Sequence, residues 1–263
     1  MHSGIIFLSL ITLSFGASIA NNNSERNVRI VGGEKAIEGQ FPYMVSLRPS
    51  YTRHEHGCGG FIISSRWIGS VAHCMINPIA KLLTLAVVGT VRTSVGGTFY
   101  RFAMWFNHPE YNIFERKNDI GVGRTRSTIT FTPLIQPIPL GSDFVGAGVK
   151  AVISGWGTLD EPLPIGQFAE DLHWVTLTTI TNEDCINLMI PEERHRIYDE
   201  NICTYDGPGI GACNGDSGSP LTANGFVIGA VSWALPCARG TSEVYPRISS
   251  YRPWIMSLIS RDE

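Results

Sequence analysis

One serine of this chain has the surroundings of an enzymatic nucleophile. Ser217 lies between glycines in the segment 215–220, where glycine lets backbone N–H groups approach a substrate closely. Upstream stand His73 and Asp119, and the chain order histidine, aspartate, serine is one of those that hydrolytic triads use. Each of the three alone is explained equally well as a turn or core residue. Together they predict hydrolysis by a serine that a histidine activates.

The segments that carry these residues are predicted to be mainly β-strands. Short runs rich in valine, isoleucine and aromatic residues alternate with glycine, proline and asparagine turn signals. Such a number of short strands is typical of sandwiches and barrels, and position 219 is serine, so the strand–helix nucleophile elbow of α/β-hydrolases is not expected. Candidate strands cover residues 43–47, 60–63, 82–88, 149–154, 172–179 and 226–232, with tight turns at 96–97 and 224–225.

Helical signals are confined to the second half of the chain. Thr181 can cap a short helix whose first turn is acidic, and Ser250 can cap a helix over 251–260. In the latter, an apolar stripe predicts packing against the body of the protein; it consists of Trp254, Ile255, Leu258 and Ile259. The proline-rich stretch 131–142 predicts a boundary between two β modules.

Composition indicates a globular protein. The chain has 263 residues, of which 43% are hydrophobic and 16% charged, and its formal net charge is −3, so it lacks the basic surface expected for nucleic acid or anionic membranes. The apolar run 4–20 is short for a membrane span and ends in small residues, which predicts a signal peptide cut after Ala20. The alternative is a buried N-terminal helix. We expect a secreted protein.

Secretion changes the interpretation of the six cysteines. An even number in an oxidising compartment predicts disulfides, although counting alone allows 15 pairings. The cysteines lack the Cys-x-x-Cys pairs and the spacing of a zinc ribbon, so a structural metal is not expected.

Taken together, the motifs resemble those of the chymotrypsin-like, trypsin-fold serine proteases. The resemblance covers residues 30 to 259 and extends beyond the three residues above. Further matching segments are Arg29-Ile30-Val31-Gly32-Gly33, Cys58-Gly59-Gly60, Ser154-Gly155-Trp156-Gly157, Ser232-Trp233 and Val244-Tyr245-Pro246-Arg247.

The resemblance implies an all-β fold of two packed six-stranded Greek-key antiparallel barrels, with a short intermediate helix and a C-terminal helix. It places the peptidase domain at 30–263, the first barrel at about 30–135 and the second at about 136–263. It also implies that Ser217 attacks the peptide carbonyl, His73 transfers the proton and Asp119 orients the imidazole.

The same resemblance assigns the neighbouring residues. The N–H groups of Gly215 and Ser217 form the oxyanion hole, and Ser219 replaces a commoner glycine without expected loss of activity. The implied disulfides are Cys58 with Cys74, Cys185 with Cys203, and Cys213 with Cys237.

An activation step is also implied. Cleavage between Arg29 and Ile30, by a trypsin-like protease, removes a propeptide at 21–29, and the new Ile30 amine pairs with Asp216. All six cysteines are used, so none tethers this propeptide. Its Asn22 lies in a glycosylation sequon that the active enzyme loses.

The substrate pocket departs from trypsin's pattern. The resemblance places Gly211 at the floor position where trypsin-like members have aspartate, and it places Glu243 on the opposite wall. Some members with an acid on that wall, such as cathepsin G and crab collagenase, accept basic as well as bulky apolar residues. Glu243 must face a substrate cation, hold a proton or pair with a residue such as Arg239, unless it turns to solvent.

For the residue before the cut, we therefore expect a mixed preference for bulky apolar and basic residues. A purely apolar preference is the second choice, and a trypsin-like preference is the third. Ala212 belongs to the same pocket, and a substrate is expected to add as a strand to Ser232, Trp233 and Ala234.

No cofactor is expected, because residues 66–109 contain no aspartate or glutamate that could form the calcium loop of some relatives. Expected partners are protein or peptide substrates and the activating protease, with protein inhibitors as candidates, and the enzyme is expected to be a monomer. A digestive, salivary or venom role is favoured. The alternatives are a regulatory protease with one target and a catalytically inactive binding homologue.

Overall fold

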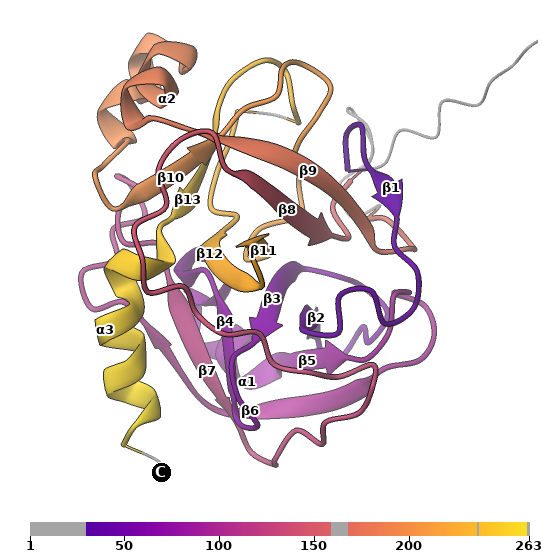
Figure 1. Ribbon diagram of the computed structural model, residues 1–263. Helices are drawn as coiled ribbons and strands as arrows, with labels where there is room; N and C mark the ends of the chain where they lie inside the picture. Colours follow the sequence, from indigo (N-terminus) through magenta and orange to yellow (C-terminus); the bar gives the residue numbers. More distant parts are fainter. Residues whose placement is uncertain (1–29, 159–167, 236, 262–263) are drawn as a thin grey trace, which may run out of the picture.

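Six antiparallel strands of the N-terminal half close into a barrel. The computed structural model describes residues 30–158, 168–235 and 237–261 (Figure 1). The barrel strands pair in the order β2-β3-β4-β7-β6-β5, and apolar side chains from five of the six strands, all but β7, form one buried cluster with residues of the connecting segments. Their bounds are β2 Met44–Pro49, β3 Cys58–Ile62, β4 Trp67–Ser70, β5 Thr84–Val88, β6 Thr98–Asn107 and β7 Gly121–Thr125.

The C-terminal half forms a second antiparallel sheet above the barrel in Figure 1. Its main path is β12-β11-β8-β9-β10-β13, and the short β1, Glu34–Lys35, pairs with β9. Its two outer strands, β12 and β13, approach each other through a bridge between Gly229 and Arg247. The bounds are β8 Lys150–Gly155, β9 His173–Ile180, β10 Asn201–Thr204, β11 Pro220–Ala223, β12 Phe226–Ala230 and β13 Glu243–Pro246.

The predicted all-β class with a short intermediate helix and a C-terminal helix is confirmed, with one difference in detail. The first half is a closed six-stranded barrel. The second half is a sheet whose main path runs from β12 to β13 without closing into a ring of paired strands. The proline-rich stretch 131–142 connects β7 of the barrel to β8 of this sheet. Residues 34–35 lie on the second sheet, so the N-terminal segment joins the later half of the chain.

Most predicted strands coincide with observed ones, namely β2, β3, β8, β9 and β12. The turn at Asn224-Gly225 joins β11 to β12, and both residues have the positive φ that tight hairpins require. Gly96 and Gly97 likewise have positive φ just before β6. Seven strands in the described ranges were not predicted. They include β7, which contains two glycines, and β11, which begins with proline.

The predicted strand 82–88 is wrong in its first two residues. These end helix α1, Pro78–Leu83, and β5 begins only at Thr84. Asn77 caps this helix by accepting the N–H of Ile79 at 2.8 Å, and proline occupies the first turn, where its missing N–H is harmless. Leu82 and Leu83 are exposed, so their apolar character misled the pattern.

The two predicted helices are present, the first with the predicted cap and the second with an earlier start. Thr181 caps α2, Asn182–Leu188, by accepting the N–H of Asp184 at 3.0 Å. Helix α3, Ile248–Ile259, begins before the predicted cap Ser250, because its buried face starts at Ile248 and continues through Tyr251. Two short 3₁₀ helices, η1 Ala72–Met75 and η2 Pro191–Arg196, complete the set in the described ranges.

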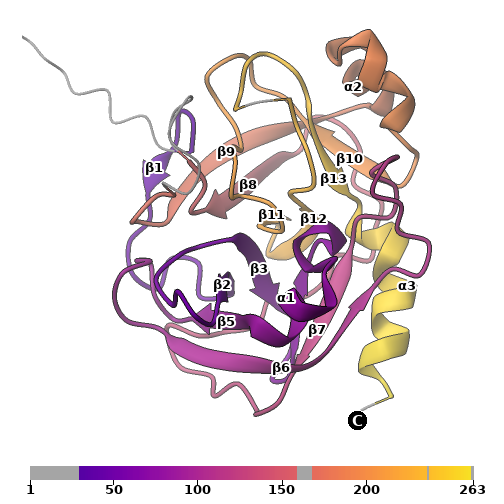
Figure 2. The ribbon, with the colours of Figure 1, turned by 180° about the vertical axis from the view of Figure 1, so that it is seen from behind.

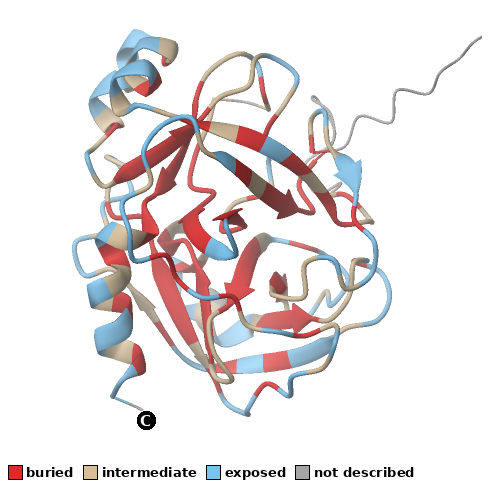
Figure 3. Ribbon diagram, in the orientation of Figure 1, coloured by how far each residue is buried: buried red, intermediate tan, exposed pale blue. Residues whose placement is uncertain are grey.

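Helix α3 closes the junction between the two halves. Both views show it beside β7 (Figures 1 and 2). Its buried side chains share one apolar cluster with Trp67 and Val122 of the barrel and Val227 of the second sheet. Buried residues concentrate along the inner strands, while the outer face of α3 is exposed (Figure 3). This apolar cluster therefore supports the loops that meet between the two halves.

Within the described residues, no helix has the length and apolar character needed to cross a membrane. The predicted signal peptide 1–20 and propeptide 21–29, including Arg29, lie outside the described residues.

Candidate active site

His73 and Asp119 come from adjacent parts of the barrel and contact each other directly. His73 lies in η1, just after β4, and Asp119 just precedes β7. The imidazole Nδ1 is 2.7 Å from Asp119 Oδ2, and the backbone N–H of His73 donates to Oδ1 at 2.8 Å. The hydroxyl of Ser232 also donates to Oδ2, at 2.6 Å. This carboxylate is buried and fixes one ring nitrogen, which directs Nε2 of His73 away from Asp119.

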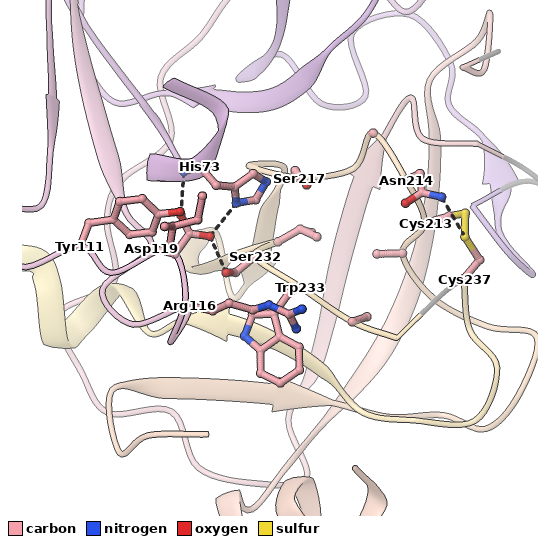
Figure 4. A pocket seen from close by; sticks show the side chains of 15 residues that line it. His73, Tyr111, Arg116, Asp119, Cys213, Asn214, Ser217, Ser232, Trp233 and Cys237 are labelled. Atoms are coloured by element: carbon pink, nitrogen blue, oxygen red, sulfur yellow. Dashed lines mark hydrogen bonds and ion pairs between the residues drawn. A yellow bond between two sulfur atoms is a disulfide. The ribbon is translucent and has the colours of Figure 1, made fainter. Parts of the chain in front are cut away.

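Ser217 comes from the second half of the chain, on the loop between β10 and β11. Its carbonyl accepts the N–H of Gly59 of the barrel at 2.7 Å, and Gly218 N–H donates to the Val231 carbonyl at 2.7 Å. Ser217, His73 and Asp119 line one cavity of about 320 Å³ at the junction of the halves, and Figure 4 shows Ser217 beside the imidazole. The three predicted residues are therefore brought together.

Asp216 holds the loop on which Ser217 lies. Its carboxylate is almost fully buried and accepts the N–H groups of Gly157 at 2.8 Å and Cys213 at 2.9 Å. Burial raises its pKa to about 6. Gly215 has a φ of +97°, and a Cβ there would collide with the ring of Phe168. Only glycine fits this position, which orients the predicted oxyanion-hole N–H groups of Gly215 and Ser217.

His56, which sequence reasoning missed, also supports the loop that carries Ser217. It is buried, and its Nε2–H donates to the Gly215 carbonyl at 2.9 Å, while Ser46 Oγ lies 2.8 Å from Nδ1. Burial lowers its pKa to about 4, so the ring is neutral at physiological pH. Ser46 also accepts from the buried guanidinium of Arg48. His56 lies between Glu55 and Gly57, and this sequence context gave no signal of such burial.

The predicted substrate-binding residues fall into two groups. Ala212, Ser232, Trp233 and Ala234 line the cavity, together with the disulfide between Cys213 and Cys237. Gly211 and Glu243 lie behind this lining rather than on it. The bridge between Trp233 and Val244 supports the wall formed by 232–234.

Glu243 is buried at the base of the pocket instead of turning to solvent. Its side chain is 5% exposed, and Oε2 accepts the hydroxyls of Tyr245 at 2.6 Å and Thr204 at 3.2 Å. Oε1 accepts the N–H of Ala212. Burial outweighs these donors and raises the carboxyl pKa to about 7. A Cβ on Gly211 would collide with Oε1, so Glu243 occupies the space that a side chain at the floor would need.

Tyr245 and Thr204 are the partners of Glu243 that sequence reasoning missed. Their hydroxyls also contact each other, at 2.9 Å, and burial raises the Tyr245 pKa well above its usual value. Tyr245 lies two residues beyond Glu243 on β13, so alternation along the strand places both on one side, and this spacing was the available signal.

Ile30 is fully buried in the core of the second sheet, with Ala212 and Val231 in the same cluster. The carbonyl of the next residue, Val31, accepts the N–H of Gly211 at 3.0 Å. The chain just after the predicted cleavage point is thus packed against the specificity pocket.

The structure contains the three disulfides that the resemblance implies. Cys58–Cys74 lies beside His73, Cys185–Cys203 joins α2 to β10, and Cys213–Cys237 borders the cavity. His73 and the first pair are close enough to form a three-ligand metal set, but their sulfurs are bonded to each other and offer no thiolate.

Ser219 is predicted to be replaceable with a gain in stability. Its hydroxyl is buried and finds no hydrogen-bond partner among the described residues. Replacing it by alanine removes an unsatisfied polar group, so Ser219→Ala should raise the free energy of unfolding by about 1 kcal/mol and Tm by about 2–4 °C. Thermal unfolding in a Ser217→Ala background avoids self-digestion.

Ser70 provides the matched control. It is equally buried, but its hydroxyl donates to the Gly59 carbonyl at 2.7 Å. Ser70→Ala should therefore lower the free energy of unfolding by about 1 kcal/mol. A loss of stability in both variants would show that the Ser219 hydroxyl does have a partner.

Comparison with known proteins agrees with this geometry. The family model described as Trypsin matches residues 30–255. Chymotrypsin-2 of Vespa crabro is 36% identical over 230 residues, which cover 86% of this chain and 98% of the relative. Trypsin delta of Drosophila melanogaster is 31% identical over 255 residues, covering 96% and 98%. Trypsin II-P29 of Gallus gallus is 32% identical over 257 residues, covering 97% and 98%.

Proposed function

Because this chain belongs to the trypsin family of serine endopeptidases, we propose that it cleaves proteins through an acyl-enzyme formed on Ser217. The observation that carries the proposal is the junction cavity, where His73, hydrogen-bonded to buried Asp119, lies with Ser217. His73 removes the proton of Ser217 as the hydroxyl attacks the peptide carbonyl. It then delivers that proton to the leaving amine, and water releases the acyl group by the reverse steps.

The backbone of the Ser217 loop supplies the second part of the catalysis. The N–H groups of Gly215 and Ser217 stabilise the oxyanion, whose charge develops only as the tetrahedral intermediate forms. Two hydrogen bonds hold this loop: Gly157 N–H donates to the Asp216 carboxylate, and His56 Nε2–H donates to the Gly215 carbonyl. The substrate backbone pairs with 232–234 as an added strand, which makes binding depend weakly on sequence away from the cut.

A direct experiment tests the assignment of the nucleophile. Protein cleaved after Arg29 is treated with a serine-directed organophosphonate, and modified peptides are identified by mass spectrometry. We expect a single modification at Ser217 with parallel loss of peptidase activity. Activity that survives complete labelling of Ser217, or labelling at another serine, would refute the mechanism.

The preference before the cut is proposed to be mixed, with bulky apolar residues accepted at every pH and lysine or arginine accepted through Glu243. The pocket wall consists of Ala212, the Cys213–Cys237 disulfide and the 232–234 segment, and a buried carboxyl lies just behind it. Gly211 has no side chain, and a Cβ at that position would collide with this carboxyl. An ionised Glu243 thus attracts a substrate cation, whereas a protonated one leaves an uncharged pocket.

This arrangement predicts a pH-dependent preference. The Glu243 pKa is about 7, so the carboxyl is protonated below that pH and ionised above it. The ratio of kcat/KM for lysine to phenylalanine peptides should rise about 30-fold from pH 5.5 to 8.5, following the ionised fraction. The ratio cancels any pH dependence of the catalytic steps that both peptides share.

Glu243→Gln is the matched variant, because glutamine keeps the size of the side chain without its charge. It should abolish cleavage after lysine and arginine, keep cleavage after phenylalanine, and make the ratio independent of pH. Wild-type enzyme that cleaves only after phenylalanine and leucine throughout this range would establish purely apolar preference instead.

We also propose that the enzyme is secreted as a zymogen, works as a monomer without a metal, and has a digestive, salivary or venom role. Six cysteines paired in three disulfides suit an oxidising compartment, in agreement with the signal peptide expected at 1–20. A trypsin-like protease is the expected activator, because the proposed cut follows Arg29.

A further inference from the structure

Arg116 places a guanidinium in the wall of the catalytic cavity that the mechanism leaves unused. Its side chain is 35% exposed and lines the cavity with His73, and its Cζ lies 4.8 Å from the centroid of the Trp233 ring. Figure 4 shows Arg116 across Trp233, on the opposite side of the cavity from the Cys213–Cys237 disulfide. A positively charged side chain therefore lies on the cavity wall opposite the specificity pocket.

The loop that carries this side chain is held by its own backbone. Asn112 and Lys117 exchange two backbone hydrogen bonds, of 3.0 and 3.2 Å, and the Asn112 side chain accepts the N–H of Phe114 at 2.9 Å. Arg116 itself has a φ of +51°, a conformation that a non-glycine residue adopts at a cost of about 1 kcal/mol. The guanidinium is thus positioned before substrate binds, which reduces the entropy lost on binding.

The charge of Arg116 is only partly compensated. Its Nη1 lies 3.3 Å from Glu193 Oε2, but the same oxygen lies 2.5 Å from Nη1 of Arg196. Two guanidinium groups therefore share one carboxylate, and the shorter contact belongs to Arg196. The carboxylate of Asp119, on the same cavity, is occupied by His73 and Ser232. One further carboxylate would complete the pairing of Arg116.

We propose that Arg116 makes the enzyme prefer substrates with aspartate or glutamate at P2, the residue immediately before the P1 residue. The inference rests on the proposed function, in which the substrate adds as an extended strand to 232–234. Side chains of such a strand alternate between its two faces. When the P1 side chain enters the pocket beside Cys213 and Cys237, the P2 side chain faces the opposite wall, where His73 and Arg116 lie.

The test uses matched peptides that share phenylalanine at P1 and differ only at P2, as glutamate, alanine or lysine. At low ionic strength we expect kcat/KM for the glutamate peptide to exceed that for the lysine peptide about tenfold, with alanine between them. Salt at about 1 M should reduce the ratio, because exposed charges are then screened.

Three variants assign the effect to one side chain. Arg116→Gln should bring the glutamate-to-lysine ratio to within about twofold of unity, and Arg116→Glu should invert it. Lys117→Gln is the control, because it removes a neighbouring cation whose ammonium contacts the Tyr198 ring and which does not line the cavity. This variant should keep the wild-type ratio.

The outcomes separate this proposal from the one on which it rests. If wild-type enzyme fails to cleave the alanine peptide, the proposed function fails. If it cleaves all three peptides equally, or if Lys117→Gln changes the ratio as much as Arg116→Gln, the assignment to Arg116 is overturned while the peptidase mechanism stands.

Discussion

Ser217→Ala is expected to reduce kcat/KM for every peptide substrate by at least about 10⁴-fold, without changing the fold. The variant keeps the cavity, the hydrogen bonds of Asp119 and the N–H groups of the loop, but has no oxygen that can form the acyl-enzyme. Residual acceleration of about 10³–10⁴-fold over water should survive from the oxyanion hole and binding. These magnitudes are those of triad serine proteases in general.

Single-turnover kinetics with excess enzyme measure so slow a reaction, and a serine-directed inhibitor added to the same sample excludes contaminating protease. Ser219→Ala is the control, since it changes a serine two residues away that lies outside the cavity lining. It should keep wild-type kcat/KM. Equal loss in both variants would point to a damaged loop, and no loss in Ser217→Ala would remove the serine from the mechanism.

The three candidate triad residues could be found in the sequence because each motif is short and local. The histidine, aspartate and serine segments come from three separate loops, and the sequence alone carries their order but not their contacts. Two antiparallel sheets bring them together at their junction. Strands with regular alternation were also predictable, whereas β13 was not, because its four residues include a glutamate and a proline and all four are buried.

Residues whose role depends on tertiary burial were harder to predict. Sequence reasoning placed Glu243 on the pocket wall and left four outcomes open for its carboxyl. The structure excludes exposure to solvent and places Tyr245 and Thr204 against the carboxylate. Arg116 is one of several charged residues in a loop, and no local pattern distinguishes it from a solvated surface arginine. Its position over Trp233 arises because the fold brings together two segments that are distant in sequence.

Gly211 and Glu243 illustrate how such positions depend on each other. A residue with a side chain at 211 would collide with the glutamate, and the glutamate in turn fills the space that the missing side chain leaves. The acid at the base of the pocket can therefore come from either position, but not from both without rearrangement. An interpretation of either residue alone would therefore give a wrong prediction of the substrate residue that the pocket accepts before the cut.

Arg29→Gln is expected to leave the protein about 10²–10³-fold less active than the wild-type enzyme exposed to the same activating protease. Asp216 is buried, and the described hydrogen bonds to its carboxylate come from the backbone N–H groups of Cys213 and Gly157. Burial raises its pKa to about 6, so the carboxylate is stabilised strongly by a cation. Cleavage before Ile30 creates an ammonium on a residue that is already packed in the neighbouring core.

Without the cut, the nitrogen of Ile30 remains an uncharged amide, so no ammonium forms there to pair with buried Asp216, and the ordered form of the Ser217 loop loses that stabilisation. The loss of a buried ion pair costs about 3–5 kcal/mol, a factor of about 10²–10⁴ in the equilibrium between ordered and disordered forms of the Ser217 loop, and the expected loss of activity lies in the lower part of this range. N-terminal sequencing together with active-site titration measures cleavage and competence in the same sample.

Arg26→Gln is the matched control, because it removes an arginine three residues earlier and leaves the Arg29–Ile30 bond intact. It should activate normally. A second variant, in which residues 26–29 carry the recognition sequence of an unrelated protease that cuts directly before Ile30, should regain activity only after that protease is added. Full activity of Arg29→Gln with its first 29 residues, or part of them, still attached would show that Asp216 does not need the Ile30 amine.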